Sequence, residues 1–177
     1  MNPIYRTFQD RSGAPYVVRD AAPEDAPHLV ELLNRVGQEE IYIADERAQL
    51  TADQEASIIQ ARNPDVQVIL VAEQNGKTAG SLEMIRGILR KNRHTALFGM
   101  ALLPEFRGRH IGRGLLIAAE DWARDAGVRK ISLAVFATNQ AAIHLYKSLG
   151  YEEEGRRYRQ YLLEDTWVDE IWMARWL

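Results

Sequence analysis

The chain has 177 residues, of which 46% are apolar and 27% charged, and its formal net charge is −3. This balance is typical of one soluble domain, residues 1–177, that buries a core without cross-links. It contains no cysteine, which excludes a disulfide framework, a thiolate zinc site and a cysteine nucleophile and is consistent with a cytoplasmic location. The longest apolar stretch, VQVILVA, is far shorter than a membrane span of ~20 residues, so we expect no membrane insertion. The acidic balance disfavours nonspecific nucleic-acid binding.

In chain order, residues 1–15 are expected to form an extended N-terminal segment, and a strand is predicted over Tyr16–Ala21. A helix is predicted over 22–36, because a proline and two acidic residues suit its first turn and leucines then recur at helical spacing. The capping-box pattern Thr-x-x-Gln predicts a second helix over Thr51–Asn63.

The Asn75-Gly76 pair between two apolar runs predicts a strand, a turn and a strand over 66–85. A strand over Thr95–Leu103 then leads through a glycine-rich loop into a helix that ends near Arg124. The last predicted elements are a strand, a helix and two strands, over 130–137, 139–150, 157–163 and 166–177. This order predicts a mixed α+β fold with a mostly antiparallel central sheet flanked by helices.

The segment Pro104–Gly114 gathers three glycines and four basic residues between a predicted strand and a predicted helix. A helix N-terminus offers unpaired N–H groups and a positive dipole end, and glycines let a ligand approach the backbone. The pattern therefore favours a phosphate site, with arginines adding charge-assisted contacts. A tight turn with solvated arginines is the alternative. The P-loop pattern fails because Leu115 stands where lysine is required, and the dinucleotide fingerprint fails because its third glycine would fall on Ile117.

Two longer stretches, MALLPEFRGRHIGRGLL and VFATNQAAIHLYKSLGYEEEG, resemble the central motifs of the GNAT superfamily of acyl-CoA-dependent N-acyltransferases. VRDAAPEDAPHLVELL is similar to the first strand and helix of that family, so the resemblance runs from Tyr16 to the C-terminus. It implies a GNAT-like fold, acetyl-CoA as acyl donor, and direct attack by a primary amine in a ternary complex. A non-catalytic domain that senses acyl-CoA is the alternative function.

The resemblance also implies roles for particular residues. The strand that ends at Leu103 would pair its backbone with the pantetheine arm, and the loop N–H groups would hold the pyrophosphate. Asn139 would contact the cofactor, and Tyr146 would lie near the thioester sulfur and protonate the leaving thiolate. The implied cofactor-binding residues are Ala101, Leu102, Leu103, Arg107, Gly108, Arg109, His110, Ile111, Gly112, Arg113, Gly114, Asn139 and Tyr146. His110 departs from the family pattern, because it stands where the first loop glycine usually lies.

Amide formation from a thioester requires an N–H donor for the developing oxyanion, which a backbone amide near Met100–Leu102 can supply, and an acceptor for the amine proton. Glu83 is the first candidate base and His94 the second; ordinary strand-surface charge is the alternative for both. For Tyr146 the alternative is packing on a helix face, and for Asn139 it is a helix N-cap. The four histidines show no metal-ligand spacing, so no metal is predicted.

The C-terminal segment resembles a subgroup that includes bacterial amino-acid acetyltransferases and ribosomal-protein N-terminal acetyltransferases. That similarity leaves a small amine, an amino acid and a protein N-terminus open as acceptors. The segments Gly37–Gln49 and Ile85–Arg93 are expected on the acceptor side. Trp167, Trp172 and Trp176 are interpreted as core or subunit contacts, with a substrate cage as the alternative. The family resemblance implies a homodimer, for which the apolar C-terminal strands offer a contact surface.

Overall fold

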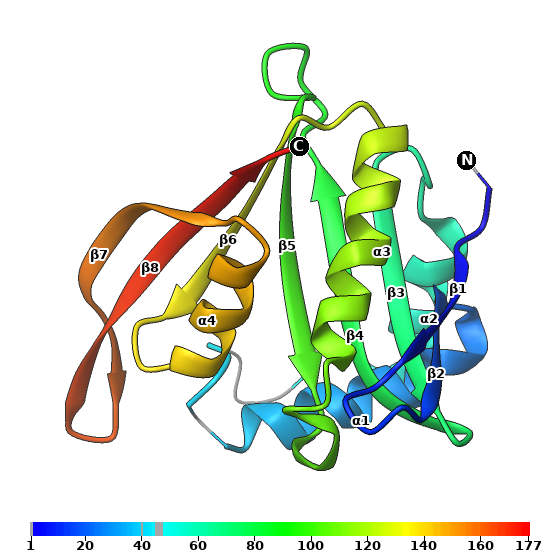
Figure 1. Ribbon diagram of the computed structural model, residues 1–177, viewed down its shortest axis with the longest axis horizontal. Helices are drawn as coiled ribbons and strands as arrows, with labels where there is room; N and C mark the ends of the chain where they lie inside the picture. The colour runs from blue at the N-terminus through cyan, green and yellow to red at the C-terminus, as the bar shows by residue number, and fades with distance from the viewer. Residues whose placement is uncertain (1, 40, 45–47) are drawn as a thin grey trace.

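A computed structural model describes residues 2–39, 41–44 and 48–177. In this part of the chain, eight strands form one sheet in the order β1-β2-β3-β4-β5-β6-β8-β7, with α-helices packed on both of its faces (Figure 1). Each neighbouring pair is antiparallel except β5 and β6, which run parallel. The predicted α+β fold with a mostly antiparallel sheet is confirmed.

The observed elements follow the predicted order, with one additional strand at the N-terminus. The strands are β1 (Tyr5–Gln9), β2 (Pro15–Asp20), β3 (Gln67–Gln74), β4 (Lys77–Arg86), β5 (Thr95–Leu102), β6 (Lys130–Phe136), β7 (Glu152–Leu163) and β8 (Thr166–Trp176). The helices are α1 (Ala26–Gly37), α2 (Ala52–Ala61), α3 (Ile111–Asp125) and α4 (Gln140–Ser148), with short 3-10 turns η1 (Pro23–Asp25) and η2 (Pro104–Phe106).

Two apolar cores lie on opposite faces of the sheet. In Figure 1, α3 and α4 cover the near face, and α1 and α2 lie behind the sheet. Leu70 and Leu82 belong to the larger core with α3 and α4, whereas Ile69 and Val71 belong to the smaller core with α1 and α2. Because β3 is buried on both faces, its sequence reads as a continuous apolar run and does not alternate.

The parallel pairing of β5 with β6 is short. It comprises Thr95 with Lys130, Ala96 with Ile131 and Leu97 with Ser132, and stops there. Beyond these pairs the two strands diverge (Figure 1). The second half of β5 is therefore an unpaired edge inside the sheet.

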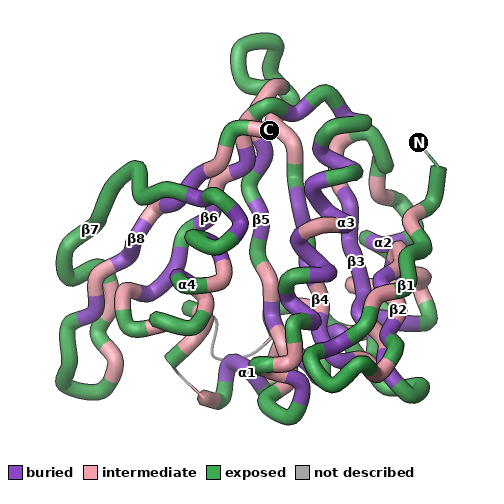
Figure 2. The backbone as a smooth tube through the Cα atoms, viewed as in Figure 1, coloured by how far each residue is buried: buried purple, intermediate pink, exposed green. Residues whose placement is uncertain are grey.

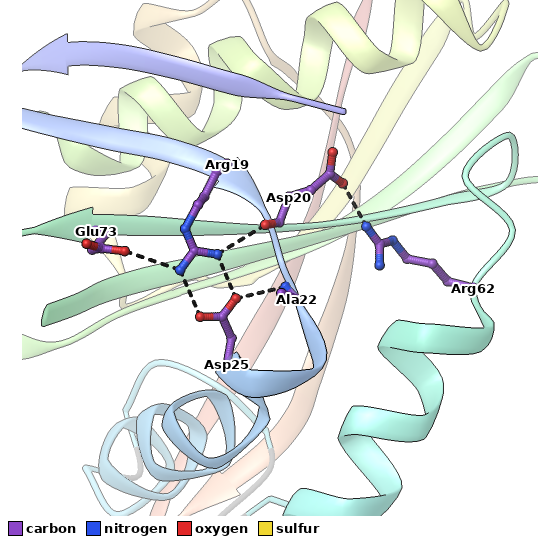
Figure 3. Close-up of polar contacts among 6 residues, drawn as sticks. All are labelled: Arg19, Asp20, Ala22, Asp25, Arg62 and Glu73. Carbon is purple, nitrogen blue, oxygen red and sulfur yellow. Dashed lines mark hydrogen bonds and ion pairs between the residues drawn. The ribbon is translucent and has the colours of Figure 1, made fainter. Parts of the chain in front are cut away.

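An ion-pair network joins β2 to the elements around it (Figure 3). Arg19 donates to both carboxylate oxygens of Asp25, at 2.7 and 2.8 Å, and to Glu73 on β3 at 3.2 Å. The Asp25 carboxylate also accepts the N–H of Ala22 at 2.8 Å, and Arg62 pairs with Asp20 at 3.0 Å. These contacts fix the turn from β2 into α1 and the end of α2 against the sheet.

The outer strand β7 contrasts with the middle of the sheet, because it is exposed along most of its length (Figure 2). Its hairpin with β8 leaves Trp167 59% exposed, and Trp176 near the end of β8 is 67% exposed. The core interpretation is therefore wrong for these two tryptophans. Trp172 is half-buried and donates its indole N–H to Glu170 at 2.7 Å.

Candidate active site

The glycine-rich loop turns through two left-handed residues before α3 begins. Gly108 has φ +68°, and His110, the N-cap residue of α3, has φ +66°. Within the described residues, the main-chain N–H groups of 108–113 donate no hydrogen bond, and the first helical bond runs from Gly114 N–H to His110 O at 3.3 Å. Six consecutive N–H groups without a partner among the described residues, at a helix N-terminus, form a place suited to an anion such as a phosphate group.

The two glycines inside α3 serve close packing. A Cβ at Gly112 would lie 3.1 Å from Leu102 Cδ1 and 3.3 Å from Leu145 Cδ2, between β5 and α4. A Cβ at Gly114 would lie 2.2 Å from the Tyr16 hydroxyl oxygen, inside van der Waals contact. The absence of these two side chains lets the first turn of α3 lie directly against β5, α4 and β2.

The three loop arginines have different surroundings. Arg107 donates to both carboxylate oxygens of Glu39, at 2.7 and 2.6 Å, and through Nε to Leu102 O at 2.9 Å. Arg109 pairs with the buried carboxylate of Asp10 at 2.5 Å. Arg113 is exposed, has no ion pair in the described part of the chain, and reaches only Ser148 Oγ at 3.5 Å. Arg113 is therefore the loop cation that is open to an incoming anion.

The unpaired edge of β5 presents the main chain of its even-numbered residues. The Thr95 carbonyl and the Leu103 N–H bond on the β4 side, whereas the His94 carbonyl accepts N–H groups from the start of β6. Main-chain groups alternate in direction along a strand, so those of Met100 and Leu102 face β6, beyond the last β5–β6 pair. Ala101 and Leu103 direct theirs toward β4, and the side chain of Ala101 is buried in the smaller core.

Tyr146 on α4 packs against the near face of β5. Its ring centroid lies 5.8 Å from that of Phe98 and 6.0 Å from that of Tyr151. Its hydroxyl makes no hydrogen bond with any described residue, and burial raises the pKa of Tyr146 well above its usual value. The phenol therefore stays protonated at neutral pH, as a general acid must. Asn139 caps the same helix, since its Oδ1 accepts the Ala142 N–H at 3.1 Å.

Glu83 on β4 lies on the other face of the sheet. It is exposed, accepts a 2.5 Å hydrogen bond from Gln67 Nε2, and stands in register with Gly99 of β5. Its register partner Ile69 belongs to the core that α1 and α2 cover, which is opposite the core containing Tyr146. The structure thus does not bring Glu83 and Tyr146 together on one face. His94 lies before β5, at the end of that strand remote from the loop.

The predicted acceptor segments lie partly outside the described residues, since 40 and 45–47 of Gly37–Gln49 are not described. In the described part, the Glu39 carboxylate accepts hydrogen bonds from Arg107, and the centroid of the Tyr42 ring lies 4.3 Å from the Arg107 guanidinium carbon. Sequence reasoning did not identify these residues, nor Asp10 and Tyr16 beneath the loop. Each lies far from its partner in the chain, and no local pattern marks such a pair.

Two features are absent from the part of the chain that the structure describes. Among residues 2–39, 41–44 and 48–177, no three or more histidine, aspartate or glutamate side chains gather as metal ligands do. No helix in the same ranges combines the length and apolarity needed to cross a bilayer.

A comparison of the sequence with models of known protein families identifies the family of this chain. The model of the acetyltransferase (GNAT) family matches residues 28–151, which include the loop, the open edge of β5 and Tyr146. The chain belongs to the GNAT family and is an acetyl-CoA-dependent N-acetyltransferase, as the sequence motifs predicted.

Particular relatives agree with this membership. The chain is 29% identical to L-amino acid N-acyltransferase MnaT of Escherichia coli K12 over 137 residues, 76% of this chain and 78% of the relative. It is 37% identical to the E. coli [ribosomal protein bS18]-alanine N-acetyltransferase over 101 residues, 57% of this chain and 66% of the relative. The crystal structure of a GNAT acetyltransferase from Streptococcus pneumoniae superposes with a TM-score of 0.85 at 31% identity, covering 92% of this chain and 99% of that one.

Proposed function

We propose that residues 1–177 form one catalytic domain, which joins the acetyl group of acetyl-CoA to the α-amine of an amino acid or of a protein N-terminus. The single observation that carries this proposal is the run of unpaired N–H groups at 108–113 beside the unpaired edge of β5. Two relatives support this acceptor class, because one is named as an L-amino acid N-acyltransferase and the other as a ribosomal-protein alanine N-acetyltransferase.

For donor binding, we propose that the N–H groups of Gly108, Arg109, His110, Ile111, Gly112 and Arg113 hold the pyrophosphate. The exposed Arg113 guanidinium adds a charge-assisted contact. Arg107 and the Arg109 side chain support the loop, because their guanidinium groups are bound to Glu39 and Asp10. Gly114 admits Tyr16, and its own N–H is already bonded to His110.

We propose that the pantetheine arm lies along the open edge of β5. The Leu102 N–H and the Met100 main chain supply hydrogen bonds there, and Leu103 shapes the wall, with Asn139 at the start of α4 facing the arm. Ala101 supports the strand from beneath, because its side chain is buried in the smaller core. When bound, acetyl-CoA supplies a thioester carbonyl that is activated toward amines. The Met100 N–H faces this edge and is the proposed donor to the developing oxyanion.

In the proposed reaction, the neutral amine attacks the carbonyl carbon, the C–S bond breaks, and the departing thiolate takes the Tyr146 proton. The proton released by the amine passes to Glu83, through water, on the acceptor face. The unpaired edge of β5 borders both faces of the sheet, and the donor and the acceptor are proposed to approach it from opposite sides.

Tyr146→Phe tests the acid role. Because the hydroxyl has no partner among the described residues, its removal should leave the free energy of unfolding nearly unchanged. It should lower kcat by about 10²-fold or more, the usual contribution of a positioned acid. Thiol release from acetyl-CoA with a panel of amino acids and alanine-terminated peptides measures kcat, and calorimetry checks that acetyl-CoA affinity is retained. An unchanged kcat removes Tyr146 from the mechanism.

We also propose a cytoplasmic homodimer. The cysteine-free sequence supports the location, and the exposed Leu162–Trp167 cross-strand pair on the β7–β8 hairpin supports a subunit contact. Light scattering of the wild type and of Trp167→Ser tests the contact; a monomeric wild type would contradict it.

A further inference from the structure

The N-terminal hairpin of β1 and β2 contacts the glycine-rich loop through the turn that joins its two strands. The buried Asp10 carboxylate accepts from Arg109 Nη2 at 2.5 Å and from Arg109 Nε at 3.1 Å. Next to it, the Arg11 N–H donates to the Arg109 carbonyl at 3.1 Å. One loop residue is therefore held by its main chain and its side chain together.

The turn that makes these contacts is itself ordered by Asp10. The same carboxylate accepts from the Ser12 hydroxyl at 2.6 Å, the Ser12 N–H at 2.8 Å, the Ala14 N–H at 3.0 Å and Gln74 Nε2 at 3.0 Å. Gln74 is buried at the end of β3. Asp10 is thus fixed from both the turn and the sheet, independently of Arg109.

A second contact comes from β2 and acts on His110. The Tyr16 hydroxyl donates to the His110 carbonyl at 3.1 Å. The buried Tyr16 ring stacks on Phe8, with 5.5 Å between the two ring centroids. The missing Cβ of Gly114 makes room for this hydroxyl. His110 has the left-handed backbone that residues with a Cβ adopt at a cost, so a contact that fixes its carbonyl offsets that cost.

We propose that the β1–β2 hairpin is a positioning device for acetyl-CoA, in which Tyr16 and Asp10 hold the loop in the conformation that exposes its N–H groups. This hairpin precedes the stretch 28–151 that matches the family model. The inference rests on the proposed role of the loop in holding the pyrophosphate. Tyr16 is a positioning residue, because it acts on the donor through His110.

The test is a double-mutant cycle with Tyr16→Phe and His110→Gly, read by acetyl-CoA affinity and by KM and kcat. In the wild-type background, Tyr16→Phe should raise Kd and KM for acetyl-CoA about 3- to 10-fold, the effect of one hydrogen bond, with kcat at saturation unchanged. Because glycine adopts positive φ freely, the same change in the His110→Gly background should cost less than about 2-fold. Tyr5→Phe removes an exposed hydroxyl from the same hairpin and should leave both constants unchanged.

Arg113→Ala separates the two proposals, because Arg113 makes no contact with the hairpin and has a role only if the loop binds phosphate. An acetyl-CoA affinity unchanged by Arg113→Ala would remove the Arg113 contact, and a wild type that shows no binding of acetyl-CoA by calorimetry would overturn the proposed role of the loop. If Arg113→Ala weakens binding but Tyr16→Phe has no effect, or has the same effect in both backgrounds, the positioning role of the hairpin is overturned and the loop assignment stands. If Tyr16→Phe changes the thermal stability but leaves the KM for acetyl-CoA unchanged, the positioning role of the hairpin is also overturned.

Discussion

Gly114→Ala tests whether the close approach of α3 to β2 is real and necessary. The added Cβ would lie 2.2, 2.9 and 3.0 Å from Oη, Cζ and Cε2 of Tyr16. Those atoms end a buried ring that is stacked on Phe8, so the neighbour cannot swing aside freely. Overpacking of this kind costs about 1–3 kcal/mol, and displacing the Tyr16–His110 hydrogen bond costs about 1 kcal/mol more. Alanine gains at most ~1 kcal/mol over glycine in a helix, so the net loss is about 2 kcal/mol.

For a chain of this length, that loss lowers Tm by roughly 4–8 °C, which calorimetry and urea unfolding can measure. Gly155→Ala is the matched control, because a Cβ at Gly155 meets nothing within 4 Å, and it should stay within about 0.5 kcal/mol of the wild type. A Gly114→Ala protein as stable as the wild type would refute the packing argument.

Three further outcomes are expected. Glu83→Gln should lower kcat/KM by about 10²-fold, measured by thiol release from acetyl-CoA; an unaltered kcat/KM would exclude Glu83 as the base. Glu120→Ala should lower the free energy of unfolding by about 3–5 kcal/mol in urea titrations, because it leaves the Arg175 guanidinium, 2.7 Å from the Glu120 carboxylate, unpaired in a largely buried place. Hydrogen bonds, first that from the Ser12 side chain, hold the pKa of Asp10 well below its usual 3.8. The stability that the Asp10 carboxylate contributes is therefore full above about pH 4 and is lost as the pH falls toward the folded pKa, so the Tm difference between wild type and Asp10→Asn should shrink between pH 4 and pH 2.

Local signals predicted the elements that depend on a few neighbouring residues. Asn139 caps α4, Thr51 caps α2, and the Asn75-Gly76 turn has two left-handed residues, each as its residue types indicate. Gly127, also left-handed, closes α3. These features need only the chemistry of four or five consecutive residues, which a single sequence displays.

The strand β1 was not predicted, because its residues are mostly exposed and show no alternation of apolar and polar side chains. Its pairing with β2 depends on the turn that Asp10 orders. The partners of Arg107 and Arg109 were not predicted either, since they lie 68 and 99 residues away in the chain. The sequence identified the loop as cationic, whereas the structure shows that two of its three guanidinium groups are bound by carboxylates.

The early end of the β5–β6 pairing has a thermodynamic consequence. An interior strand that lacks a neighbouring strand along half of one edge has fewer main-chain hydrogen bonds to hold it than the rest of the sheet has. The donor arm proposed to lie there would replace the missing neighbour, so occupancy and folding become linked equilibria. At a free acetyl-CoA concentration 100 times its Kd, the linkage adds about 2.7 kcal/mol to the folded state, and the metabolic supply of acetyl groups would then influence how long each molecule of the enzyme survives.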